Sequence, residues 1–79
     1  MNTIQAQWST FEAMVVPKNA PPVQRQEMRR AFYAGAEAMM RIQRAIGDES
    51  ISVDAGVAIL EGCYDEALGF ALQVQNGEA

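Results

Sequence analysis

The sequence predicts an all-α protein built from three helices, one short and two long. Apolar residues recur every three or four positions along almost the whole chain, which is the spacing of one helix face. Helix-breaking residues gather at only two places, the segment PKNAPP at 17–22 and the segment GDES at 47–50. Because no repeat, low-complexity tract or long linker divides the chain, we expect residues 1–79 to form one helical domain.

The first helix is predicted by an apolar face at Ile4, Trp8, Phe11 and Val15. Pro17 ends it, because the residue before a proline is driven out of helical geometry. We expect the two aromatic side chains of this face to attach the helix to the rest of the molecule. The connector that follows is rich in proline and should be stiff and extended.

The second helix should begin at Pro21 or Pro22, since proline suits the first helical position, where its missing N–H costs nothing. Gly47 should end it. The predicted core line follows the alternating steps of three and four of a heptad seam. Its members are Met28, Phe32, Gly35, Met39, Ile42 and Ile46.

The third helix should be capped by Ser52, with Asp54 favourable near its positive end. One apolar face comprises Val53, Val57, Leu60, Tyr64, Ala67, Leu68 and Ala71, and it is widened by Ile59, Cys63, Phe70 and Val74. A helix apolar around more than half its circumference requires more than one neighbour. A chain of this size buries only roughly 60–65% of its unfolded surface, so we expect a second copy to supply that neighbour in an oligomeric helical bundle.

Several classes of chemistry find no support in the sequence. Cys63 is the only cysteine and there is no histidine, so neither a disulfide within the chain nor a Cys/His zinc site can form. Phosphate-binding glycine loops and catalytic triads are missing, and we therefore expect a binding protein that is not an enzyme and uses no cofactor or metal. The N-terminal segment does not resemble a secretory signal and no run reaches about 20 apolar residues, so we expect a cytoplasmic protein that does not span the membrane.

Charge is distributed unevenly along the chain. Residues 1–47 hold six cations and three carboxylates, a net charge of +3, whereas residues 48–79 hold seven carboxylates and no cation, a net charge of −7. The overall charge of −4 argues against binding to nucleic acid. The asymmetry can serve solubility, docking between subunits or a local anion site.

The cations of the second helix lie opposite its apolar seam, with a tyrosine among them. The candidate ligand-binding residues are Lys18, Arg25, Gln26, Arg29, Arg30 and Tyr33. Guanidinium groups match phosphate oxygens, a tyrosine ring stacks on a base, and a helix N-terminus favours an anion. The alternative is a solvated face, in which Arg41 pairs with Glu37 and other arginines pair with the acidic third helix of a neighbouring subunit.

Two resemblances sharpen the functional expectation. The segments WSTFEAMVVP and QRQEMRRAFYAGAEAM resemble a family of small phage proteins over residues 8–40, with matches at Gln24, Glu27, Arg30, Ala31, Phe32, Ala34, Gly35 and Ala36. More loosely, the chain resembles the phage sponges that sequester cyclic oligonucleotide signals of CBASS immunity. That likeness matches at Gln24 and at Arg29 or Arg30, while Glu37 and the third helix depart from it. It implies capture of a nucleotide second messenger between subunits, in the host cytosol.

The leading hypothesis is accordingly a non-catalytic phage accessory protein that counters host defence by sequestering a nucleotide signal. The alternatives are an inhibitor or adaptor that docks on a host defence protein through its third helix, and a purely structural helical oligomer. Loss of binding on truncating Arg29 or Arg30 favours the first, and greater sensitivity in the third helix favours the second.

Overall fold

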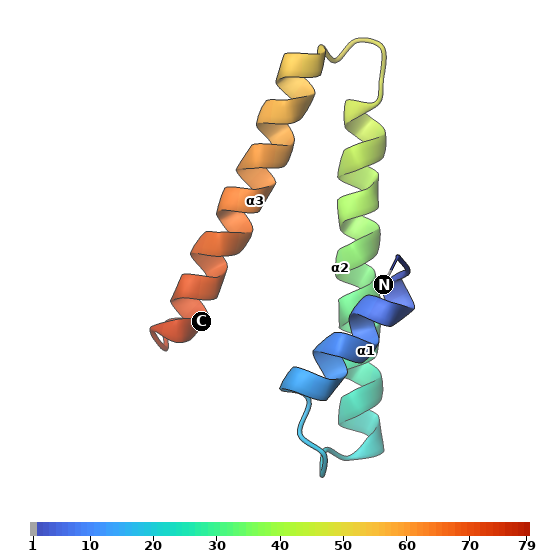
Figure 1. The fold of residues 1–79 in the computed structure, drawn as a ribbon, viewed down its shortest axis with the longest axis vertical. Helices are drawn as coiled ribbons and strands as arrows, with labels where there is room; N and C mark the ends of the chain where they lie inside the picture. Colours follow the sequence, from blue (N-terminus) through green and yellow to red (C-terminus); the bar gives the residue numbers. More distant parts are fainter. Residues whose placement is uncertain (1) are drawn as a thin grey trace. The chain divides into compact units, whose positions relative to one another are not determined.

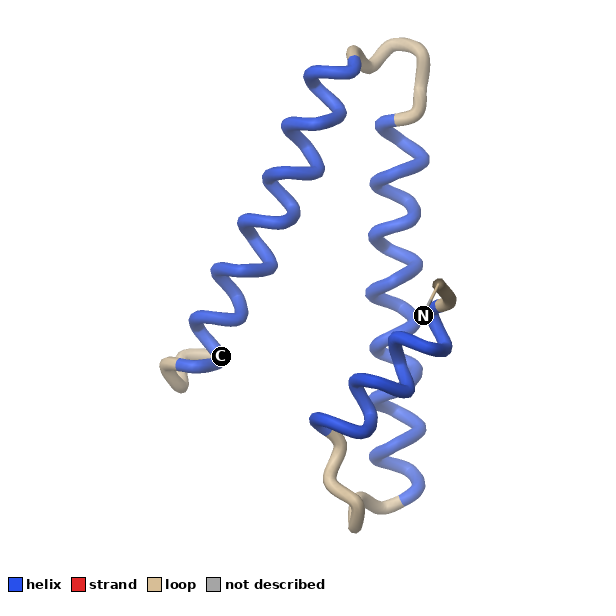
Figure 2. Tube along the Cα trace, viewed as in Figure 1, coloured by secondary structure: helices blue, strands red, loops and turns tan. Residues whose placement is uncertain are grey.

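The computed structural model describes residues 2–79 and confirms the all-α class with three helices. They are α1 (Ile4–Val15), α2 (Pro22–Ile46) and α3 (Val53–Gln75), joined by two loops (Figures 1 and 2). The chain separates into two compact units, one up to Arg41 and one from Ile42 to Ala79. The first unit therefore contains α1 and most of α2, and the second contains the last turn of α2 together with α3.

An aromatic cluster attaches α1 to α2, as the sequence predicted. Trp8 is 4% exposed, and its ring centroid lies 5.8 Å from that of Phe11 and 5.5 Å from that of Phe32 on α2. Phe11 and Phe32 are themselves 5.3 Å apart. Tilted and edge-on ring pairs at these distances stabilise packing beyond the burial of their area. Figure 1 shows the result, with α1 lying across the first half of α2.

The end of α1 corrects one predicted core position. Val15, which the helical spacing placed on the core face, is 54% exposed, whereas Val16 is 6% exposed. Val16 precedes Pro17 and has extended backbone angles, with φ −81° and ψ 123°. Because the helix stops at Val15, the helical period no longer decides which of the two valine side chains turns inward.

Both ends of α2 lie where the sequence placed them. Pro22 is its first residue, and at its end the Gly47 N–H donates to the carbonyl oxygens of Gln43 and Arg44, each at 3.2 Å. The predicted core line is less buried than expected. Four of its members are half-buried, namely Met28, Phe32, Met39 and Ile46, whereas Gly35 and Ile42 are exposed.

Local capping determines the bounds of α3. The Ser52 hydroxyl accepts a hydrogen bond from the Ala55 N–H at 3.1 Å, which confirms the predicted N-cap. At the other end Gly77 has a φ of +74°, its N–H donates to the Val74 carbonyl at 3.1 Å, and the Glu78 N–H donates to the Gln73 carbonyl at 2.8 Å. This Schellman arrangement favours glycine, because other residues rarely adopt a positive φ.

Close packing between the last turn of α2 and the first turn of α3 occurs at Gly56. This residue is the buried position of α3, and a Cβ placed on it would lie 3.7 Å from the Cβ of Ile46. Because a β-carbon would already be in contact, a larger side chain would push the two helices apart. The last turn of α2 and the first turn of α3 are therefore in direct contact within the second unit.

A carboxylate organises the turn between α2 and α3. Asp48 accepts a hydrogen bond from the Ser50 N–H at 2.8 Å, and this bond, with a further one from the Ser50 side chain, holds the pKa of Asp48 below its ordinary value. Because the pKa of Asp48 is lower in the folded protein than in the unfolded chain, this hydrogen bond stabilises the folded state fully at pH values above the ordinary aspartate pKa of about 3.9. The stabilisation is lost as the pH falls through the lowered pKa of Asp48.

We therefore expect the amide proton of Ser50 to titrate with a midpoint below that of an aspartate in an unfolded peptide. NMR chemical shifts recorded between pH 7 and pH 2 measure this midpoint, with an unstructured peptide that contains the same turn sequence as the comparison. A midpoint for Asp48 at or above the ordinary aspartate value would contradict the hydrogen bond.

A candidate anion pocket on the first unit

Five of the six predicted ligand-binding residues line one open pocket with a volume of about 620 Å³. Its lining residues are Glu12, Pro22, Arg25, Gln26, Arg29, Arg30 and Tyr33. All but Glu12 belong to the first three turns of α2, where the steps of three and four between 22, 26, 29, 30 and 33 bring them to one side of the helix. Lys18 does not line this pocket.

Lys18 instead lines a second hollow of about 380 Å³. Glu12 and Arg25 belong to the walls of both hollows, so the two adjoin at these side chains. Lys18 is therefore separated from the pocket that the arginines line but borders the hollow next to it, and its part in ligand binding stays a prediction.

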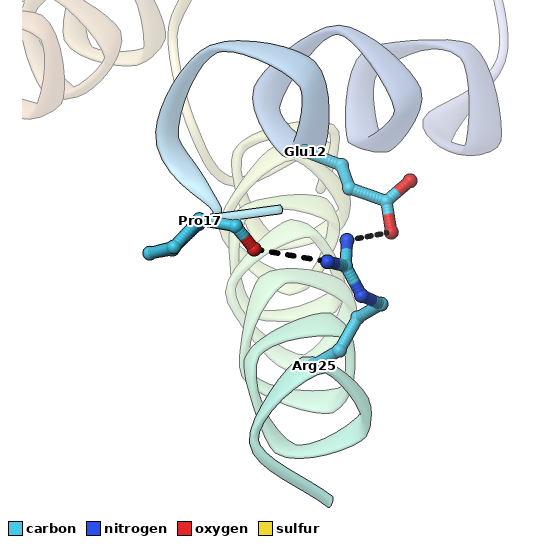
Figure 3. A network of polar contacts seen from close by, with 3 residues as sticks. All are labelled: Glu12, Pro17 and Arg25. Carbon is cyan, nitrogen blue, oxygen red and sulfur yellow. Dashed lines mark hydrogen bonds and ion pairs between the residues drawn. The ribbon is translucent and has the colours of Figure 1, made fainter. Parts of the chain in front are cut away.

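Arg25 has a structural role that the sequence did not reveal. Its Nη1 donates to Oε2 of Glu12 at 2.8 Å, and its Nη2 donates to the Pro17 carbonyl at 3.0 Å, so the side chain bridges α2, α1 and the connector (Figure 3). Both side chains of the ion pair are 33% exposed. Because both of its terminal nitrogens are engaged within the protein, Arg25 is a weaker candidate phosphate ligand than its neighbours.

Arg29 is the guanidinium of the pocket that has no carboxylate within 4.0 Å among residues 2–79. Its Cζ lies 5.2 Å from the ring centroid of Tyr33, one helical turn further along, in a cation–π contact. This contact orients the guanidinium without neutralising it. Arg29 therefore has hydrogen-bond donors and charge available for a ligand.

Arg30 contributes a second, weakly paired cation. Its Nη1 lies 3.4 Å from Oε1 of Glu27, and the two side chains are 67% and 63% exposed. Exposed pairs of this kind are worth less than about 1 kcal/mol, so a phosphate can compete for this guanidinium.

Tyr33 links the pocket to the aromatic cluster. Its ring is half-buried and lies 6.4 Å from the ring of Phe32 in an edge-on arrangement. A ring held in this way is a firm platform for stacking, since little side-chain freedom remains to be lost on binding.

The solvated-face interpretation holds for another part of α2. Arg41 donates to Glu37 at 2.8 Å across one turn, as the spacing predicted, and both side chains are about two-thirds exposed. These two residues lie outside the pocket. Within α2, only the first turns therefore contribute to the candidate site.

Residue types that bind metal ions do not come together in the part of the chain that the structure describes, residues 2–79. Over the same residues, none of the helices combines the length and the apolar character needed to span a membrane. Comparisons with protein-family models, with curated proteins and with solved structures find no match to this chain. The resemblance to phage proteins accordingly stays a prediction.

Proposed function

We propose that the pocket of the first unit binds a nucleotide-type ligand, which carries both phosphate and an aromatic base, and that the protein sequesters this ligand without altering it. The observation that carries the proposal is Arg29, a guanidinium that has no carboxylate partner among residues 2–79 and is held over an aromatic ring inside a pocket. Arg29 and Arg30 match phosphate oxygens, and the ring of Tyr33 offers a surface on which a base can stack.

The remaining lining residues favour an organic ligand over inorganic phosphate. Gln26 offers both a donor and an acceptor, and Glu12 retains the oxygen Oε1 that Arg25 does not bind. A carboxylate oxygen repels a bare anion but accepts a hydrogen bond from an amino or imino group of a base. A ligand with phosphate at one end and N–H donors at the other suits this combination.

In this proposal the protein sequesters a nucleotide that the host uses as a defence signal, in keeping with the resemblance to phage proteins. Native mass spectrometry with AMP, cyclic di-AMP, cyclic di-GMP and inorganic phosphate identifies which probe is retained. Denaturing the complex and recovering the ligand by liquid chromatography then tests sequestration. Recovery of the intact nucleotide is expected, and a hydrolysed product would show that the protein is a catalyst.

Replacing Arg29 with alanine is expected to weaken binding of the retained nucleotide about tenfold, because one charge-assisted hydrogen bond is lost at about 1.4 kcal/mol. Isothermal titration calorimetry measures this change. The matched control is Arg44→Ala, which removes the same side chain from the same helix outside the pocket. Tyr33→Phe should bind nearly as well as the unaltered protein if the ring stacks, whereas Tyr33→Ala should not.

Two results would contradict the proposal. One is the absence of binding by every probe in the panel. The other is an equal loss of affinity in Arg29→Ala and Arg44→Ala, which would mean that general positive charge rather than the pocket attracts the nucleotide.

A further inference from the structure

The α3 helix exposes a continuous apolar stripe, which we call the seam face. Its members follow one another at steps of three or four residues and are Val53, Val57, Leu60, Tyr64 and Leu68, with exposed fractions of 82%, 48%, 37%, 66% and 50%. Contiguous apolar surface on this scale is uncommon on soluble monomers and typically marks an interaction site. None of these five residues lines the candidate pocket.

The seam face is not the side of α3 that its own unit covers. Within that unit, Gly56 is buried against Ile46, and Cys63, seven residues further along the same line, is half-buried. At 100° per residue, the line through Gly56 lies about 80° around the helix from Tyr64. Within the second unit, contact with the last turn of α2 therefore does not cover the seam face.

An acidic edge borders the seam face. Asp54, Glu61 and Asp65 recur at steps of seven and four, on the side of the seam away from Gly56. The chain has no cation after Arg44, and none of these three carboxylates has an ion-pair partner among residues 2–79. A partner that covers the seam face should therefore present cations beside an apolar surface.

The α2 helix of the same protein has this chemistry. Arg44 has no carboxylate within 4.0 Å among the described residues, and Met40, one helical turn before it on the same side of α2, is 49% exposed. Each copy of the chain thus carries both an acidic and a basic apolar surface. In a two-fold symmetric dimer, the acidic surface of each copy can therefore contact the basic surface of the other.

We propose that the seam face of α3 is covered by a second copy of this chain, with its acidic edge beside Arg44 on the partner's α2. The occupant is another copy rather than an unrelated protein, because the same sequence carries a cation, Arg44, that has no carboxylate partner among residues 2–79 and lies beside an exposed apolar side chain. This inference does not depend on the nucleotide proposal, since neither Arg44 nor the seam face belongs to the pocket.

Sedimentation equilibrium and light scattering on the full chain test the proposal. The unaltered protein at about 50 µM should have a mass at least twice the 8.6 kDa of one chain, and the double variant Tyr64→Glu/Leu68→Glu should sediment at the mass of one chain. The matched control is Gln73→Glu, which adds a negative charge on the opposite side of the same helix and should keep the unaltered mass. Circular dichroism checks that each variant remains helical.

The contribution of the Arg44 charge to self-association is tested separately. Arg44→Glu should raise the dissociation constant of self-association at least fivefold, whereas Arg44→Lys should leave it within twofold. A monomeric unaltered protein would overturn the proposal, because the seam face would then be covered by its own chain or by a different protein. An oligomer that tolerates both Tyr64→Glu/Leu68→Glu and Arg44→Glu would overturn it as well.

Discussion

Replacing Trp8 with alanine is expected to lower the free energy of unfolding by about 3–5 kcal/mol, the range for truncating a buried aromatic side chain. Trp8 is one of only two buried apolar side chains among residues 2–79, and it contacts the rings of both Phe11 and Phe32. A chain of this length has a total stability on the order of 4–12 kcal/mol. We therefore expect α1 to separate from α2 at temperatures where the unaltered protein is folded.

Urea denaturation followed by far-ultraviolet circular dichroism measures this loss. Tryptophan fluorescence cannot follow the unfolding of the Trp8→Ala variant, because Trp8 is the only tryptophan of the chain. The control is Met14→Ala on the same helix, where a side chain that is 80% exposed is removed and a change within about 0.5 kcal/mol is expected. A loss below about 1 kcal/mol for Trp8→Ala would mean that the aromatic cluster does not hold α1 in place.

Replacing Arg25 with alanine is expected to lower the free energy of unfolding by about 2 kcal/mol. The change removes two hydrogen bonds, one to Glu12 and one to the Pro17 carbonyl. Because a third of each charged side chain remains exposed, solvent screens the pair, and the effect should be smaller than for a buried ion pair. The connector should also become more mobile, since Pro17 loses its bond to α2.

A double-mutant cycle isolates the contact between the two charges. Arg25→Ala and Glu12→Gln are measured singly and together by urea denaturation, and a coupling energy of about 1 kcal/mol is expected. Arg30→Ala provides the comparison, because its exposed pair with Glu27 should change stability by less than about 0.5 kcal/mol. Additive effects of Arg25→Ala and Glu12→Gln would refute a direct interaction.

The helices and their ends were largely predictable because they depend on neighbours close in sequence. Pro22, Gly47 and Ser52 act on the backbone within one turn, so their positions alone place the ends of α2 and the start of α3. The pocket-lining residues of α2 were predictable for the same reason, since one helical period determines which of them share a side. Docking of α1 through Trp8 followed from its apolar face.

The bridge from Arg25 to Glu12 could not be predicted in this way. It joins residues 13 positions apart and depends on the angle at which α1 crosses α2, which periodicity does not determine. The hollow that Lys18 lines could not be predicted for a similar reason, because it depends on the path of the proline-rich connector. Burial along α2 was overestimated, since a heptad seam indicates which side of a helix seeks a neighbour but not how much of it is covered.

The placement of cations has a consequence for limited proteolysis. Trypsin cuts only after lysine or arginine, and all five arginines lie within α2, so Lys18 is the one cleavage site outside a helix. A brief digestion of the native protein should therefore cut first between residues 18 and 19, leaving α1 as a separate peptide held to α2 by the aromatic rings and by Arg25. The time for which this peptide remains bound reports how firmly α1 is held, while residues 45–79 contain no tryptic site and survive as one fragment.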